Sequence, residues 1–108
     1  MRSEGTELPG AVARTVVYLC ADFERRRGLI ENKLVSRRTE LEYRYLNFKI
    51  ADAAAEIVGE KYAMTMINEI GRRRGYANSQ LLYMSERLYK VQKNEVIINI
   101  ARRLHLID

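Results

Sequence analysis

The stretch of sequence that decides the fold is MINEIGRRRGYANSQLLYMSERLYKV, residues 66–91. Its pattern predicts two helices joined by a tight turn, with three arginines at residues 72–74 at the corner. Ile70 closes the apolar face of the first helix, and Gly71 follows where the second helix is expected to cross so closely that only a small side chain fits. Gly75 stands where the chain leaves that helix, a position that favours positive φ. This is the outline of a helix-turn-helix.

The second helix of this unit is predicted to begin at Asn78, because asparagine is a good N-cap. Apolar side chains recur after it at three- and four-residue intervals and form one buried stripe: Leu81, Met84, Leu88 and Val91. The side chains predicted to face outward are Ser79, Gln80, Tyr83 and Arg87. These outward side chains are therefore the candidates for contact with a partner.

The positive charge of the chain is unevenly distributed. Its net charge is +5. Residues 1–70 contain 11 lysines and arginines and 11 acidic residues, whereas residues 71–108 contain 8 and 3. The basic C-terminal third favours a polyanionic partner, because each neutralised phosphate releases condensed counterions. The alternative is that the arginines at 72–74 only keep a turn soluble and complement a helix C-terminus. Their position at the predicted corner favours the first interpretation.

Length and composition favour a single cytoplasmic domain. The 108 residues allow one modest core, and the presence of a single proline favours long helices. Cys20 is the only cysteine, which excludes an internal disulfide and a cysteine-based zinc site, and its apolar neighbours predict a buried side chain. There is no apolar run of about eighteen residues and no apolar signal region in the first ten, so we expect neither a membrane contact nor export.

The predicted architecture is a small all-α domain of four to five helices with a C-terminal helix-turn-helix. Its expected parts are a flexible segment at 1–8, N-terminal helices over 9–58, the helix-turn-helix over 60–93 and a closing helix over 95–106. Within the helix-turn-helix, the first helix is predicted from Glu60 to Arg73 and the second from Asn78 to about Lys93. Asn94 and Glu95 are a plausible start for the closing helix.

The N-terminal region is predicted to form two helices. The first extends from about residue 9 to residue 36, and Gly28 marks a bend or break within it, because glycine costs about 1 kcal/mol relative to alanine in a helix. The second is capped by Ser36 or Thr39 and ends at Gly59. Leu46, Ile50, Ala53 and Ile57 are its expected buried stripe.

Three further groups of side chains are interpreted as structural. The run Arg25–Arg27 is expected on a solvated helix face, where acidic neighbours balance it. Met64, Met66 and Met84 are expected to fill gaps in the core. His105, the only histidine, is expected at or near the surface. None of these groups is assigned a binding role.

The sequence offers little for catalysis. It contains no phosphate-binding glycine loop, nucleophile elbow or zinc-ligand set. Glu56 and Glu60 share a helix face, but a helical di-metal site also needs a Glu-x-x-His pair, and His105 is far along the chain. We therefore expect no enzyme, no cofactor, no metal and no small-molecule substrate.

Residues 67–91 resemble the helix-turn-helix of sigma-factor region 4, and more specifically the small phage-encoded sigma-like regulators of late genes. Glu69–Gly71 and Gly75–Tyr76 match the first part of that motif, and Ser79–Leu81 match the start of its recognition helix. Arg74 occupies a position where the family usually carries an apolar side chain. The resemblance implies a transcriptional regulator that binds promoter DNA. RNA polymerase is a candidate partner, although the resemblance by itself does not imply that contact.

The first functional hypothesis is a sequence-specific double-stranded DNA-binding protein, a transcriptional regulator of a phage or mobile element. The helix from Asn78 would lie in the major groove. The side chains expected to reach base edges are Asn78, Ser79, Gln80, Tyr83 and Arg87. Those expected to hold the DNA backbone are Arg72, Arg73, Arg74, Lys90 and Lys93, and Tyr76 completes the predicted DNA-binding set. The N-terminal helices would form core and a homodimer interface.

Two alternatives stay open at this point. A non-enzymatic helical interaction or assembly module, such as a phage structural component, would use its long first helix and alanine-rich second helix for docking. In that case Leu82, Tyr83 and Tyr89 would be protein contacts. A DNA-recognition subunit of a packaging machine would share the motif without the regulatory role.

Overall fold

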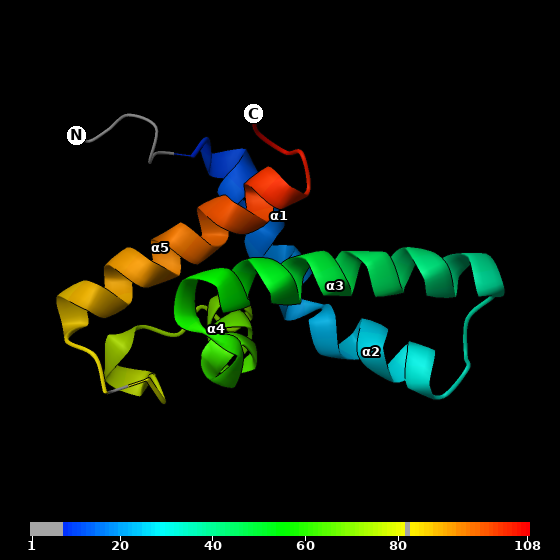
Figure 1. Ribbon diagram of the computed structural model, residues 1–108, viewed down its shortest axis with the longest axis horizontal. Helices are drawn as coiled ribbons and strands as arrows, with labels where there is room; N and C mark the ends of the chain where they lie inside the picture. Colours follow the sequence, from blue (N-terminus) through cyan, green and yellow to red (C-terminus); the bar gives the residue numbers. More distant parts are fainter. Residues whose placement is uncertain (1–7, 82) are drawn as a thin grey trace.

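The computed structural model describes residues 8–81 and 83–108, and the regular structure in these ranges is helical throughout (Figure 1). The elements are α1 (Gly10–Ala21), α2 (Phe23–Glu31), α3 (Arg37–Val58), α4 (Glu60–Gly71), the 3₁₀ turn η2 (Tyr76–Asn78) and α5 (Glu86–Arg103). The predicted all-α class is confirmed. The segment expected to be flexible falls, up to residue 7, outside the described residues, as does Leu82. None of the described helices is both long and apolar enough to cross a bilayer.

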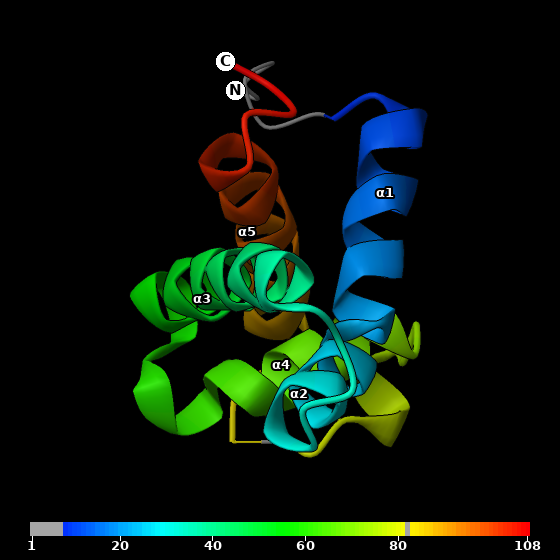
Figure 2. The same ribbon diagram turned by 90° about the vertical axis from the view of Figure 1, so that its right-hand side faces the viewer.

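The other helices are arranged around α3. Helices α2, α4 and α5 pack against it, and α1 packs against α4 and α5. In Figure 1, α1, α4 and α5 surround the C-terminal half of α3, whereas its N-terminal half and α2 project to one side. Figure 2 looks nearly along α3 and shows α1 standing beside it. The core lies at the crossing of α1, α3, α4 and α5, where the fully buried side chains include Val16, Ile50, Met66, Ile67, Val96 and Ile100.

The first predicted helix is broken at Asp22, not at Gly28, which lies inside α2. The side chain of Arg26 packs at this break and is 2% exposed. Its Nη2 donates to the backbone carbonyl of Leu19 at 2.7 Å, and its Nε donates to Oδ1 of Asn47 on α3 at 2.7 Å. A buried guanidinium needs such acceptors. The prediction that the whole Arg25–Arg27 run faces solvent is therefore wrong for its central residue.

Helix α3 begins and ends at predicted residues. Ser36 is its N-cap, and its side chain accepts a hydrogen bond from the backbone N–H of Thr39 at 3.2 Å. Gly59 ends the helix with φ of 87°, a backbone conformation that residues with a Cβ rarely adopt. Ile50 and Ala53 are fully buried, as expected for the stripe, and allow α4 and α5 to pack closely on α3.

Gly71 lies at a close helix crossing, as predicted, but the crossing helix is a different one. A Cβ on Gly71 would come within 2.7 Å of the backbone N and Cα of Ala21. The partner is therefore the end of α1, and not a second helix of a helix-turn-helix. The small side chain predicted there serves the junction between α1 and α4.

The predicted helix-turn-helix is wrong in its second half. Helix α4 ends at Gly71 and α5 begins at Glu86, so residues 72–85 form the connection and η2 is the only regular structure described within it. A helix-turn-helix joins its helices through about three or four residues. No helix begins at Asn78, which instead ends the 3₁₀ turn.

Helix α5 begins later than predicted, and part of the predicted apolar stripe is therefore not buried. Ser85 is the N-cap, and its hydroxyl accepts a hydrogen bond from the backbone N–H of Leu88 at 3.1 Å. Leu88 and Val91, predicted to be buried, are 44% and 47% exposed, whereas Tyr89 is 1% exposed. Leu81 and Met84 are buried, but from the connection and not from a helix. Helix α5 then continues without the break expected at residues 94–95.

Candidate nucleic-acid interface at the end of helix α4

Helix α4 is followed by a turn that contains the three arginines, Arg72, Arg73 and Arg74. The backbone N–H of Arg74 donates to the carbonyl of Glu69 at 2.9 Å, and that of Arg73 donates to the carbonyl of Ile70 at 3.1 Å. These two bonds form a Schellman motif, and Arg73 takes the left-handed conformation with φ of 56°. Gly75, where positive φ was predicted, has φ of −91°. Arg72 and Arg73 are exposed as a result, and Arg74 is half-buried.

A buried carboxylate attaches the following connection to α4. Glu69 is 3% exposed, and its Oε1 accepts hydrogen bonds from the hydroxyls of Ser79 at 2.7 Å and Tyr89 at 2.9 Å. Its Oε2 accepts the backbone N–H of Gln80 at 2.7 Å. Ser79 also accepts the backbone N–H of Leu81 and is 6% exposed. The prediction that Ser79 faces outward is therefore wrong, because its hydroxyl belongs to this network.

Lys93, which was predicted to hold the DNA backbone, belongs to the same network. The Lys93 ammonium donates to the carbonyl of Arg74 at 2.5 Å and lies 5.7 Å from the centre of the Tyr89 ring. Burial lowers the pKa of Lys93, and the negative charge of Glu69 opposes that shift. Burial also raises the pKa of Tyr89 to about 12, assisted by its bond to Glu69. Lys93 thus supports the turn from within.

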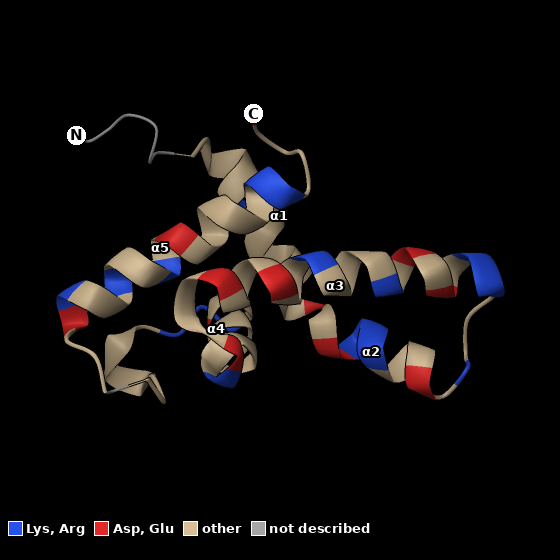
Figure 3. Cartoon of the chain, viewed as in Figure 1, with Lys and Arg blue, Asp and Glu red and all other residues tan. Residues whose placement is uncertain are grey.

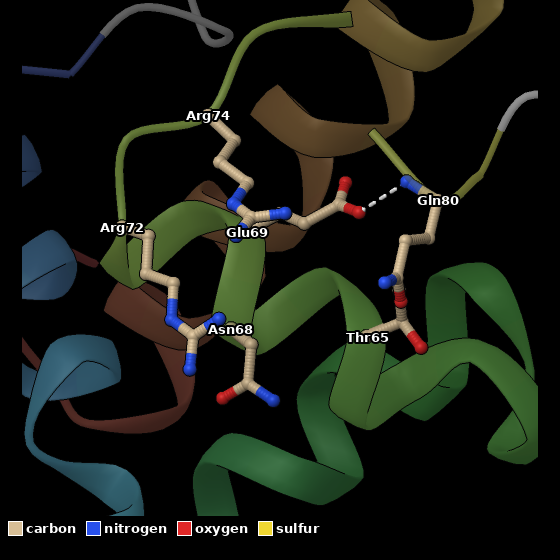
Figure 4. Close-up of a pocket in the computed structure, with 6 residues that line it drawn as sticks. All are labelled: Thr65, Asn68, Glu69, Arg72, Arg74 and Gln80. Atoms are coloured by element: carbon tan, nitrogen blue, oxygen red, sulfur yellow. Dashed lines mark hydrogen bonds between the residues drawn. The ribbon is translucent and has the colours of Figure 1, made fainter. Parts of the chain in front are cut away.

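A small polar cavity of about 80 Å³ opens between α4 and the connection (Figure 4). Its lining residues are Thr65, Asn68, Glu69, Arg72, Arg74 and Gln80. In Figure 4 the side chains of Arg72 and Arg74 extend from the turn toward the side on which Thr65 and Asn68 lie. Both oxygens of Glu69 are occupied by the donors described above. The remaining groups of the lining are donor-rich, which suits an oxyanion.

Ion pairing distinguishes these arginines from those of α2 and α3. Every arginine of α2 and α3 has a carboxylate at 2.5–3.9 Å. Figure 3 accordingly shows acidic and basic residues interleaved along both helices. In the part of the chain that the structure describes, no such pair involves the arginines at 72–74 or Arg87. Six described arginines thus have no such pair: Arg72–Arg74 lie at the corner and Arg87 at the start of α5, and the other two are Arg14 on α1 and Arg102 near the end of α5.

The other predicted DNA-binding residues of the connection have different surroundings. The hydroxyl of half-buried Tyr76 donates to the carbonyl of Met84 at 2.9 Å. Asn78 is exposed, and its carbonyl accepts from Arg74 at 3.4 Å. Tyr83 is 59% exposed and stacks on Tyr62 of α4 with ring centres 4.7 Å apart. Tyr76 is therefore structural, whereas the last two side chains are accessible.

Two predicted residues lie on the first turns of α5. Arg87 and Lys90 are exposed and line a shallow groove with Glu86 and Val91. Lys90 forms an ion pair of 3.1 Å with Glu86, one turn earlier. The structure thus brings Arg72, Arg74 and Gln80 into one cavity, and places Arg87 and Lys90 in a separate groove.

Sequence reasoning did not assign three residues of the cavity to the site: Thr65, Asn68 and Glu69. Thr65 and Asn68 lie on the same face of α4 as Arg72, at intervals of three and four residues. This helical spacing is the signal that could have found them. Polar residues that share a face ending at an arginine indicate a polar groove along that helix.

No family model, curated protein or solved structure matches the chain. Among the described residues, no group of three or more His, Cys, Asp and Glu side chains is placed to hold a metal ion. Cys20 is 2% exposed, as predicted, and burial raises the pKa of its thiol to about 12. Function is therefore inferred from the arginines at 72–74 and from Arg87.

Proposed function

We propose that this protein binds double-stranded DNA through the basic corner, which we define as Arg72, Arg73 and Arg74, with Arg87 at the start of α5 as a separate contact. The observation that carries the proposal is the difference in ion pairing. The arginines of α2 and α3 each have a carboxylate within 4 Å in the same chain, whereas those of the basic corner have no such pair among the described residues. Unpaired guanidiniums grouped on one side of a protein favour a polyanion.

The cavity at the end of α4 can hold one phosphate group of the DNA backbone. Arg72 and Arg74 line it from the turn, and Asn68 and Gln80 add amide donors. A guanidinium binds phosphate in bidentate fashion, which fixes orientation as well as supplying charge. Arg73 is exposed on the same turn and would contact a neighbouring phosphate. These contacts would position the protein without reading the sequence.

Base readout is assigned to the first turns of α5, since no helix starts at Asn78. Arg87 is exposed there, and arginine can donate two hydrogen bonds to guanine in the major groove. Leu88, 44% exposed on the same turns, offers an apolar contact for a thymine methyl group. A role in transcription rests on the resemblance of residues 67–91 to phage-encoded regulators.

A mobility-shift assay with a random-sequence duplex at low salt tests the proposal. The variant Arg72→Ala/Arg73→Ala/Arg74→Ala should lose most of the affinity, because three phosphate contacts are removed. The matched control is Arg25→Ala/Arg27→Ala/Arg44→Ala, which removes the same charge from exposed arginines that have carboxylate partners. If both variants weaken binding equally, net charge alone is responsible and the basic corner is not the site.

A second candidate function, the helical interaction module, is favoured by a separate observation. Helix α3 exposes Leu41, Tyr45 and Phe48, which are 51%, 57% and 63% accessible. Large apolar side chains grouped on one exposed face mark interaction surfaces. This function does not compete with DNA binding, because the two surfaces use different residues.

A further inference from the structure

One face of α3 is uncovered and has the spacing of a helix-packing seam. Leu41, Tyr45 and Phe48 follow one another at intervals of four and three residues. The same alternation places Arg38 before them and Asp52 after them. We call these five residues the α3 seam. Alternating intervals of three and four residues bring side chains onto one stripe, which is how two helices pack along their length.

The two ends of the seam carry opposite charge. At the N-terminal end, the side chains of Arg37 and Arg38 are 78% and 89% exposed, and their pairs with Glu40 and Glu42 are long, at 3.9 and 3.6 Å. At the C-terminal end, Asp52 and Glu56 share the single guanidinium of Arg103, at 2.6 and 3.1 Å. The first end can therefore take a carboxylate, and the second can take a cation.

The shape of the seam also differs between its halves. Beside the C-terminal half, α3 and α4 enclose a largely apolar groove of about 280 Å³, and its apolar lining is Phe48, Ala51, Ala55, Ala63 and Met64. The N-terminal half presents the bulky side chains of Leu41 and Tyr45 instead. The side chains of the N-terminal half therefore protrude, and the groove beside the C-terminal half can accommodate such side chains.

We infer that a second copy of this chain packs antiparallel on the α3 seam and forms a two-fold symmetric dimer. A two-fold interface uses the same surface of both partners. With the axis near Tyr45, Leu41 of each copy lies against the groove of the other, and Arg38 lies opposite Asp52. A parallel pair would instead place arginine against arginine and groove against groove. The inference goes beyond DNA binding and does not depend on it.

Sedimentation equilibrium of the full chain over a range up to about 100 μM tests the interface. We expect the wild type to dimerise, and we expect Tyr45→Ser/Phe48→Ser to weaken dimerisation by about tenfold or more, because its buried apolar area is lost. The control is Tyr18→Ser, which changes a 72% exposed tyrosine on α1 and should leave dimerisation unchanged. A monomeric wild type, or a dimer that the double variant does not weaken, would overturn the inference.

Charge reversal tests the antiparallel orientation. Arg38→Glu alone and Asp52→Lys alone should each dimerise more weakly than the wild type, because like charges then face each other at both ends. An equimolar mixture of the two variants should recover a heterodimer, in which both ends are complementary. Glu56 still holds Arg103 in Asp52→Lys, and circular dichroism checks that the fold is kept. Variants that self-associate as well as the wild type would contradict the antiparallel arrangement.

Discussion

The hydroxyl of Tyr89 on α5 donates a 2.9 Å hydrogen bond to the buried carboxylate of Glu69 on α4. This bond joins the two helices on either side of the connection, and it leaves the carboxylate dependent on protein donors. Tyr89→Phe should lower the free energy of unfolding by about 1–3 kcal/mol, because a buried charged acceptor loses one of its donors. Urea denaturation measures the change. Tyr83→Phe, at an exposed tyrosine, should have almost no effect.

The same hydroxyl predicts a loss of stability in alkali. The pKa of Tyr89 is raised from 10.0 to about 12, first by burial and then by its bond to Glu69. The native state keeps a proton that the unfolded chain releases above pH 10, so this stabilisation is complete below pH 10 and is lost as the pH approaches 12. The loss should reach about 2–3 kcal/mol.

The pH dependence of Tyr89→Phe provides the comparison. Cys20, whose raised pKa acts in the same sense, and Lys93, whose lowered pKa acts in the opposite sense, are present in both proteins. The difference between the two stability curves therefore isolates Tyr89. A constant difference from pH 9 to 12 would contradict the assignment of the raised pKa to this hydroxyl.

Arg73 permits a substitution that should separate stability from binding. It has φ of 56°, which is strained for a residue with a Cβ, so Arg73→Gly should stabilise the fold by about 0.5–1 kcal/mol. It also removes a cation of the basic corner and should weaken DNA binding. Lys33→Gly is the matched control, because φ there is 54° and the same charge is lost in the loop between α2 and α3. Thermal unfolding and DNA titration of both variants measure the effects; equal weakening of binding would count against the corner.

Gly71 and Gly28 should respond oppositely to the same substitution. Gly71→Ala places a methyl group 2.7 Å from the backbone of Ala21, and we expect a loss of about 1–3 kcal/mol as α1 and α4 separate. Gly28→Ala meets no atom within 4 Å inside α2 and should gain about 0.5–1 kcal/mol. Chemical denaturation measures the change in the free energy of unfolding of each variant. Changes of the same sign would contradict the close crossing of α1 with α4.

Local sequence signals predicted the features that depend on neighbouring residues. Ser36 as a cap and Gly59 as a helix end follow from interactions within one turn of the chain. Cys20 is also at the buried position expected of it. These positions are set by backbone conformation or by the apolar pattern of a single helix, which a sequence displays directly.

The predictions that failed depend on contacts between distant residues. Asn78 and Ser85 are both good N-caps, and Ser85 caps the helix because Glu69 holds Ser79 and the N–H of Gln80 in a non-helical connection. The burial of Arg26 depends on Asn47, which lies on another helix. Neither set of contacts leaves a periodic signal in the sequence. The capping preference of Asn78 and the solvation preference of Arg26 are therefore overridden by tertiary contacts.

The salt dependence of DNA binding tests the central claim most directly. Fluorescence anisotropy of a labelled duplex gives the slope of log K against log salt concentration for the wild type and for Arg72→Ala/Arg73→Ala/Arg74→Ala. We expect the variant to have a slope shallower by about 2–3, since each lost phosphate contact accounts for about 0.9. An identical slope in a variant that stays folded, or a wild type with no affinity for DNA at low salt, would contradict DNA binding through the basic corner.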